Sequence, residues 1–181
     1  MIWDNNEDIK KIECRNNASQ VQQLLNENRE LRSPYVFLLD TMREIEALHR
    51  ILVPVTMLQE EVYKAEICSY LCRKTDAQII ILQPNDYGSK AKINIGKITT
   101  LLDKFSLPYR IEQGKKNTFS LYKEACQRAD EFQADLLLLT ASREYGWDDL
   151  IFGPVERYVI QHAKVPVMLV NPRADLFSLC D

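Results

Sequence analysis

The chain has 181 residues, of which 46% are hydrophobic and 27% are charged, as is ordinary for a globular protein. The formal net charge is -3, because residues 1–49 hold nine acids and six bases whereas residues 50–181 hold seventeen of each. A neutral body without a basic stripe argues against a dedicated nucleic-acid-binding protein and against a protein that binds anionic membranes. No apolar run reaches the roughly 18–20 residues that a membrane span needs.

The start of the chain is acidic and lacks the apolar stretch of a signal peptide. The five cysteines, an odd number, show no spacing typical of a disulfide framework. Both observations favour reduced thiols and a cytoplasmic location.

Segment 50–181 is predicted to be one α/β domain. Apolar runs typical of strands buried on both faces, and one weaker alternating strand at 109–113, are separated by stretches with helical spacing. This alternation predicts a five-stranded parallel sheet with helices on both faces and a ligand site beyond the carboxyl ends of the strands. The buried strands are predicted at 51–55, 77–82, 136–139 and 165–170, and the helices at 59–73, 90–105, 117–132 and 148–163.

Residues 1–49 are predicted to form a separate N-terminal helical extension. The run Ser19-Gln20-Val21-Gln22 is a capping box that would open a helix through Arg32. Ser33-Pro34 would open a second helix to about Arg50, with a helical spacing of Leu38, Met42 and Ile45. Three roles stay open for this extension: packing on the body, a helical dimer contact, or a linker within a longer protein.

Three stretches in the carboxyl-terminal part of the chain are the most informative: Ala134-Asp135-Leu136-Leu137-Leu138-Leu139-Thr140, then Phe152-Gly153-Pro154-Val155-Glu156-Arg157-Tyr158-Val159, then His162-Ala163-Lys164-Val165-Pro166-Val167-Met168-Leu169-Val170. Together with the first predicted strand, Ile51-Leu52-Val53-Pro54-Val55, they resemble the universal stress protein family. The resemblance covers about residues 50–172. It implies an α/β fold with strand order 3-2-1-4-5, homodimerisation through the fifth strand, and ATP binding in some members.

The nucleotide motif of that family is degenerate in this chain. ATP-binding members resemble one another in a G-x2-G-x9-G-[ST] loop, whose glycines let backbone N–H groups approach phosphates closely, and in an Asp after the first strand. Here the same spacing gives Thr140, Arg143, Gly153 and Pro154, and Thr56 stands where the Asp would be. Only one glycine is kept, and Pro154 lacks a backbone N–H. These changes oppose phosphate binding, so we expect no cofactor and disfavour ATP or AMP.

Other residues near the predicted cleft allow two interpretations each. Arg143 can replace backbone donors to an anion, or it can pair with a neighbouring acid in a solvated loop. The aromatic run Tyr145-Gly146-Trp147 can stack on a ligand base, or it can close an empty cleft as a hydrophobic plug. The second interpretation is favoured in both cases, because exposed ion pairs are common and exposed apolar clusters tend to be buried. Met57 and Leu58 make the loop after the first strand bulky, which also opposes phosphate binding.

No catalytic residue and no metal site is predicted. Cys68 and Cys72 lie on one helix face, but two ligands without a histidine in reach make an incomplete site, so we interpret them as packing residues. His162 is interpreted as a residue that packs and caps the end of the last helix, and His49 lies before the first strand. No sequence typical of a hydrolase, a metalloprotease or a P-loop occurs.

The last predicted strand is apolar, and an apolar edge strand is normally paired or covered. We therefore expect a homodimer through this strand, although the tail 173–181 could cover it instead. The candidate dimer residues are Val165, Val167, Met168, Leu169 and Val170.

Taken together, the sequence predicts a cytoplasmic, bacterial, non-enzymatic binding or regulatory protein of the stress response. Two alternatives stay open: an ATP- or AMP-binding protein that uses other contacts, and a regulatory domain that acts on a membrane transporter or another protein.

Overall fold

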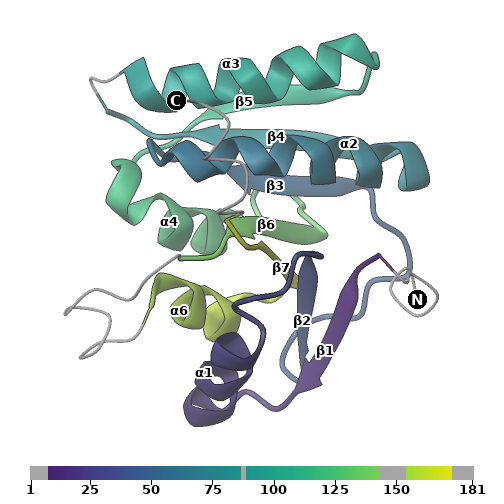
Figure 1. The fold of residues 1–181 in the computed structure, drawn as a ribbon, viewed down its shortest axis with the longest axis vertical. Helices are drawn as coiled ribbons and strands as arrows, with labels where there is room; N and C mark the ends of the chain where they lie inside the picture. Colours follow the sequence, from purple (N-terminus) through teal and green to yellow (C-terminus); the bar gives the residue numbers. More distant parts are fainter. Residues whose placement is uncertain (1–7, 87–88, 143–153, 173–181) are drawn as a thin grey trace.

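The computed structural model describes residues 8–86, 89–142 and 154–172. They form one seven-stranded sheet in the order β1-β2-β7-β6-β3-β4-β5, with helices on both faces (Figure 1). All neighbouring strands are parallel except β2 and β7, which are antiparallel.

Five of the strands come from segment 50–181. Four of them are apolar runs, which suit strands covered by helices on both faces. The fifth, β5, is an edge strand with exposed polar residues, as its alternating sequence predicts. These strands are β3 (Arg50–Pro54), β4 (Gln78–Gln83), β5 (Tyr109–Gln113), β6 (Leu136–Thr140) and β7 (Val167–Val170).

The helices of this segment lie between the strands, close to their predicted positions. A short 3-10 helix, η1 (Gln59–Tyr63), leads into α2 (Lys64–Thr75), and α3 (Ser89–Lys104) follows β4. A second 3-10 helix, η2 (Thr118–Ser120), leads into α4 (Leu121–Arg128). The last described helix is α6 (Val155–His162). Helices α2 and α3 pack on one face of the sheet, and α4 and α6 pack on the other.

The N-terminal segment differs from the prediction. Only its first predicted helix exists, as α1 (Ala18–Glu27), which Asn17 caps; strand β1 (Lys10–Cys14) precedes it. The second predicted helix is wrong, because Tyr35–Leu39 forms strand β2. Its aromatic and branched side chains are buried among neighbours on both faces of the sheet, and this packing outweighs the helical spacing of Leu38, Met42 and Ile45.

The predicted sheet is corrected by the structure, because the N-terminal segment contributes strands to it. The sheet is mixed and has seven strands rather than five parallel ones, because β1 and β2 join it. Strand β7 is not at an edge: it pairs with β6 on one side and with β2 on the other. The predicted dimer residues Val165, Val167, Met168, Leu169 and Val170 are buried inside the chain.

The core consists of two apolar clusters, one on each face of the sheet. The first includes residues of α1, α4 and α6, and the second includes residues of α2 and α3. None of the helices in the described part of the chain combines the length and the hydropathy needed to cross a membrane.

Candidate functional site

The candidate site lies at the carboxyl ends of β3 and β6. The chain leaves β3 toward β4 and β5 on one side and returns to β6 and β7 on the other, so the strand order reverses between β3 and β6. In open α/β sheets such a point is the usual place for a ligand. Here it holds a mainly apolar cavity of about 180 Å³, lined by Thr56, Met57, Leu58, Thr118, Phe119, Tyr122, Thr140, Ala141, Ser142 and Val155.

A buried ion pair lies beneath this cavity. Glu61 comes from η1 and Lys64 from the first residue of α2, and both side chains are 0% exposed. The Lys64 ammonium donates hydrogen bonds to Glu61 Oε2 at 2.6 Å and to the Pro54 carbonyl at 2.6 Å. A charged pair this deep in a protein persists only when its remaining hydrogen bonds are also satisfied.

Tyr122 of α4 completes the arrangement and connects it to β6. Its hydroxyl donates to Glu61 Oε1 at 2.6 Å and accepts from Lys64 Nζ at 3.3 Å and from the Thr140 backbone N–H at 3.2 Å. The Thr56 hydroxyl donates to the same Glu61 oxygen at 3.0 Å. We call Thr56, Glu61, Lys64 and Tyr122 the buried polar network.

The environment shifts the pKa of two members of the network. Burial lowers the pKa of Lys64 below its usual range, and the neighbouring Glu61 opposes this effect. Burial, followed by the charge of Glu61, raises the pKa of the Tyr122 hydroxyl well above its usual range. Tyr122 is therefore a neutral donor to Glu61 over the physiological range of pH.

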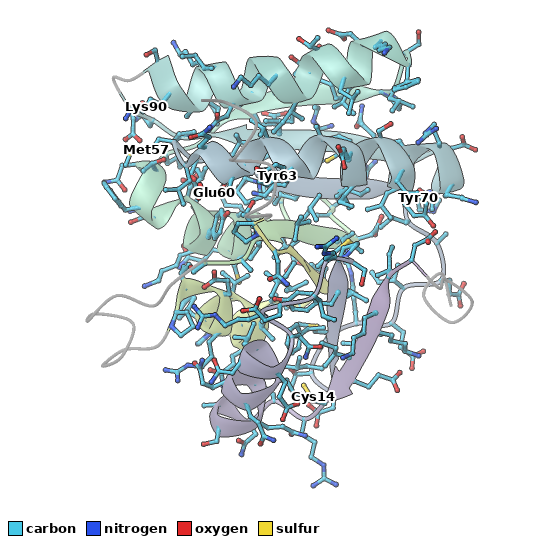
Figure 2. The ribbon with its side chains drawn as sticks, in the orientation of Figure 1. Cys14, Met57, Glu60, Tyr63, Tyr70 and Lys90 are labelled. Atoms are coloured by element: carbon cyan, nitrogen blue, oxygen red, sulfur yellow. The ribbon has the colours of Figure 1, made fainter. Side chains whose placement is uncertain are left out.

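The segment that enters the site from β3 is held in place by side chains from other elements. The Asn94 amide of α3 donates to the carbonyls of Thr56 at 3.0 Å and Leu58 at 2.7 Å. The Met57 backbone N–H donates to Thr118 Oγ1 at 3.0 Å. Met57, labelled in Figure 2, lies in the segment that connects β3 to α2. These bonds fix the bulky Met57 and Leu58 at the cavity.

A carboxylate of the chain itself lies at the start of α6. Glu156 is in the first turn of this helix, is buried, and its Oε1 accepts a hydrogen bond from the Ser142 backbone N–H. Backbone N–H groups after a strand and at a helix start are the donors that commonly bind anions. Pro154, at the N-cap of α6, contributes no such donor.

The structure thus brings together only part of the predicted nucleotide residues. Thr56 and Thr140 meet at the cavity, and Pro154 lies at the nearby helix start. Arg143 and Gly153 are outside the described residues, and so are Tyr145-Gly146-Trp147.

Sequence reasoning missed Glu61, Lys64, Tyr122 and Glu156. For the first two, a signal was present: Lys64 stands four residues before the buried Cys68, on the face of α2 that packs against the sheet. A charge on that apolar face needs a partner of opposite charge, and Glu61 stands three residues earlier.

Cys68, Cys72 and His162 take ordinary structural places. Cys68 and Cys72 lie on the buried face of α2. Burial raises the pKa of both thiols, to about 11 for Cys72. His162 stacks on Tyr158 within α6, and its Nδ1 lies 2.8 Å from the Tyr158 carbonyl. Within the described ranges, no three His, Cys, Asp or Glu side chains are grouped to hold a metal ion.

A wider hollow of about 610 Å³ lies beyond the carboxyl ends of β1 and β2. Its charged lining residues, such as Glu13, Arg15 and Glu44, are exposed at the surface. It has none of the buried charges that mark the site between β3 and β6.

Comparison with known proteins agrees with this architecture. Residues 120–171 match the model of the universal stress protein family. No curated protein matches the chain. A universal stress protein from Archaeoglobus fulgidus DSM 4304 superposes with a TM-score of 0.65 at 15% identity, over 93% of this chain and 62% of that one.

Two further solved structures have the same fold. A putative universal stress protein from Pseudomonas aeruginosa UCBPP-PA14 has a TM-score of 0.58 at 13% identity, over 95% of this chain and 66% of that chain. A universal stress protein in complex with cAMP has a TM-score of 0.56 at 15% identity, over 71% of this chain and all of that chain. The chain thus spans less than two thirds of the Archaeoglobus protein. The predicted family-level resemblance is confirmed: the chain is similar to the universal stress proteins in sequence over residues 120–171 and in fold over most of its length.

Proposed function

We propose that the protein is a universal-stress-protein-like binding or regulatory protein whose nucleotide site is degenerate. The observation that carries this proposal is the buried polar network at the carboxyl ends of β3 and β6. Its charges are already paired, and the cavity left above it, about 180 Å³, is smaller than the roughly 300–1,000 Å³ of ordinary ligand pockets.

The chemistry of the described residues around the cavity supports the same conclusion. The ammonium of Lys64 donates hydrogen bonds to Glu61 and to the Pro54 carbonyl, so it is not available to bind a phosphate. The Glu156 carboxylate accepts a hydrogen bond from the Ser142 backbone N–H, so this donor is already used. A phosphate at the same place would also be repelled by the negative charge of Glu156. A role in the stress response, without enzymatic activity and in the cytoplasm, follows as part of the proposal from the family resemblance.

A thermal-shift titration tests this proposal. The purified chain is heated with ATP, AMP or cAMP, with and without Mg²⁺; cAMP is included because one similar structure holds it. A ligand at a hundred times its Kd adds about 2.7 kcal/mol, which corresponds to a rise of about 5–11 °C in Tm for a chain of this size. We expect no shift with any of the nucleotides.

A clear shift would overturn the degenerate-site proposal in favour of nucleotide binding through other contacts. Arg143→Ala then tests one such contact, because Arg143 stands at a position of the family's nucleotide motif. Arg110→Ala is the matched control, since Arg110 is on the far edge strand β5 and pairs with Glu112.

A further inference from the structure

Two β–α–β units lie side by side at one end of the sheet. The first consists of β1, α1 and β2, and the second of β6, α6 and β7; the two strands within each unit are parallel. The units meet where β2 runs antiparallel to β7 (Figure 1). Two like units with an antiparallel contact are related by a local two-fold axis, which is the geometry of a symmetric dimer interface.

The strand register places this axis at one residue pair. Val36 lies opposite Met168, and the flanking pairs are Tyr35 with Leu169 and Phe37 with Val167. A two-fold rotation about the central pair exchanges the two strands and turns each flanking pair into the other. The contact is therefore self-complementary in its backbone, although the side chains differ.

The same local feature begins the second strand of each unit. Pro34 precedes β2, and its carbonyl accepts from the Lys10 N–H at 3.0 Å. Pro166 precedes β7, and its carbonyl accepts from the Leu137 N–H at 3.0 Å. A proline directly before a strand leaves no ladder donor unpaired. Both units therefore begin their parallel pairing in the same way, as does the β4–β5 pair, where the Pro108 carbonyl accepts from the Ile79 N–H at 3.0 Å.

The helices of the two units also pack against each other on one face of the sheet. Near the start of α1, the Asn16 amide donates to the Gln161 carbonyl of α6 at 2.8 Å. The Arg157 guanidinium of α6 donates to Gln22 of α1 at 3.4 Å. The contact between the units thus extends from the sheet to the helix layer.

Polar bonds close the far end of the contact. Asn171, just after β7, donates through its amide to the carbonyls of Asn28 and Leu31, at 2.9 Å each, and its oxygen accepts from the Tyr35 hydroxyl at 3.1 Å. The residues of β2 and β7 at the contact are as buried as the rest of the core.

We infer that β1–α1–β2 is a built-in partner for the β7 edge: the chain itself supplies the β–α–β unit that closes its sheet, in the place where a second copy of β6–α6–β7 would fit. The β7 edge is therefore not available to another chain. A homodimer, if one forms, uses a different surface.

Cysteine cross-linking tests this inference in the full chain. In a Val36→Cys/Met168→Cys variant the two thiols lie directly opposite each other, about 4.5–5.5 Å apart between Cβ atoms before relaxation, which is close to what a disulfide spans. We expect oxidation to give a disulfide within one chain, seen as a faster-migrating monomer on a non-reducing gel and as a linked peptide after digestion.

Met168→Cys alone is the matched control. If β7 paired with β7 of another copy about the same axis, residue 168 would face its own counterpart and oxidation would link two chains. We expect no such dimer above the background of the oxidised wild-type chain, whose five cysteines are kept. A linked dimer from the single variant, or between chains in the double variant, would overturn the inference.

Hydrogen exchange on the unmodified chain answers the same question if a variant fails to fold. We expect the protection of the backbone amides of β2 and β7 against exchange to stay the same over a wide range of protein concentrations. Protection of β7 that grows with concentration would show that its partner comes from another molecule and would refute the built-in pairing.

Discussion

The carboxyl ends of β3 and β6 and the contact between β2 and β7 are alike in one respect. Each is a place where an α/β sheet commonly receives another molecule, a ligand in the first case and a further strand in the second. At each place this chain supplies the contacts from its own residues: the buried polar network at the first, and β1–α1–β2 at the second.

The two places differ in the kind of contact, and this difference sets how each responds to change. The network depends on a few charged bonds in a buried site, so removing one partner leaves the other charged and unpaired. The contact between the strands spreads over a backbone ladder, two helices and many apolar side chains, so single polar losses there cost less. Substitutions that remove one polar group at each place sharpen this comparison.

The largest effect is expected for Lys64→Met. The substitution removes the donor to Glu61 and to the Pro54 carbonyl and leaves the carboxylate buried with only Tyr122 and Thr56 as donors. We expect the free energy of unfolding to fall by about 3–5 kcal/mol, measured by urea denaturation.

Two further variants show whether the unpaired charge is the cause. Adding Glu61→Gln to Lys64→Met removes the charge and is expected to restore part of the lost stability. Lys92→Met, at an exposed position of α3, is the matched control and should change stability by less than about 0.5 kcal/mol. Equal losses for Lys64→Met and Lys92→Met would contradict the assigned role of the pair.

A smaller effect is expected at the contact between the two β–α–β units. Asn171→Ala removes the bonds to the Asn28 and Leu31 carbonyls and the acceptor of the Tyr35 hydroxyl. We expect a loss of about 2 kcal/mol in the free energy of unfolding, and about 1 kcal/mol for Tyr35→Phe, which removes the bond from the Tyr35 hydroxyl to Asn171.

The control for this prediction is Asn26→Ala, on the exposed side of α1, which should be close to neutral. If Asn171→Ala proved as neutral as the control, the polar closure of the contact would have no energetic role. A loss as large as that of Lys64→Met would mean that the contact is no more tolerant of polar loss than the network.

The two places also differ in how far the sequence predicts them. Four of the five strands of segment 50–172 are apolar runs between turn residues, and these signals are local, so the elements can be found from the sequence alone. Strand β2 was missed because Tyr35–Leu39 is too short to show a period, and Ser33-Pro34 suits a helix start as well as a strand start. The segment becomes a strand because it pairs with β1 and β7, neither of which is adjacent to it in sequence.

For the candidate site, the sequence predicts that Thr56 and Thr140 lie close together but does not reveal the buried polar network beside them. Thr56 follows β3 and Thr140 ends β6, so the proximity of the two residues could be inferred from the topology. The network could not be inferred in full, because Tyr122 reaches Glu61 only through the packing of α4 over the sheet. Tertiary contact, rather than local pattern, pairs these groups.

An effect smaller than that of Asn171→Ala is expected for the support of α4, the helix that brings Tyr122 to the network. Glu124 of this helix accepts from the backbone N–H groups of Lys115 at 2.8 Å and Lys116 at 2.7 Å and pairs with Arg128 at 2.7 Å. Burial raises the pKa of Glu124, but these bonds outweigh it, so the pKa lies below its ordinary value of 4.5.

The sign of the pH effect follows from this lowered pKa. The charged form of Glu124 stabilises the fold above the unfolded-state pKa, and its contribution is lost as the pH falls through the lower folded-state pKa. Glu124→Gln should therefore cost about 1.5 kcal/mol at neutral pH and progressively less in acid, measured by urea denaturation at several pH values. A cost that does not change with pH would assign the loss to packing around the side chain rather than to its charge. Such a result would mean that mainly apolar contacts hold α4 in place. The position of Tyr122 in the network would then depend on apolar packing, as the contact between β2 and β7 does.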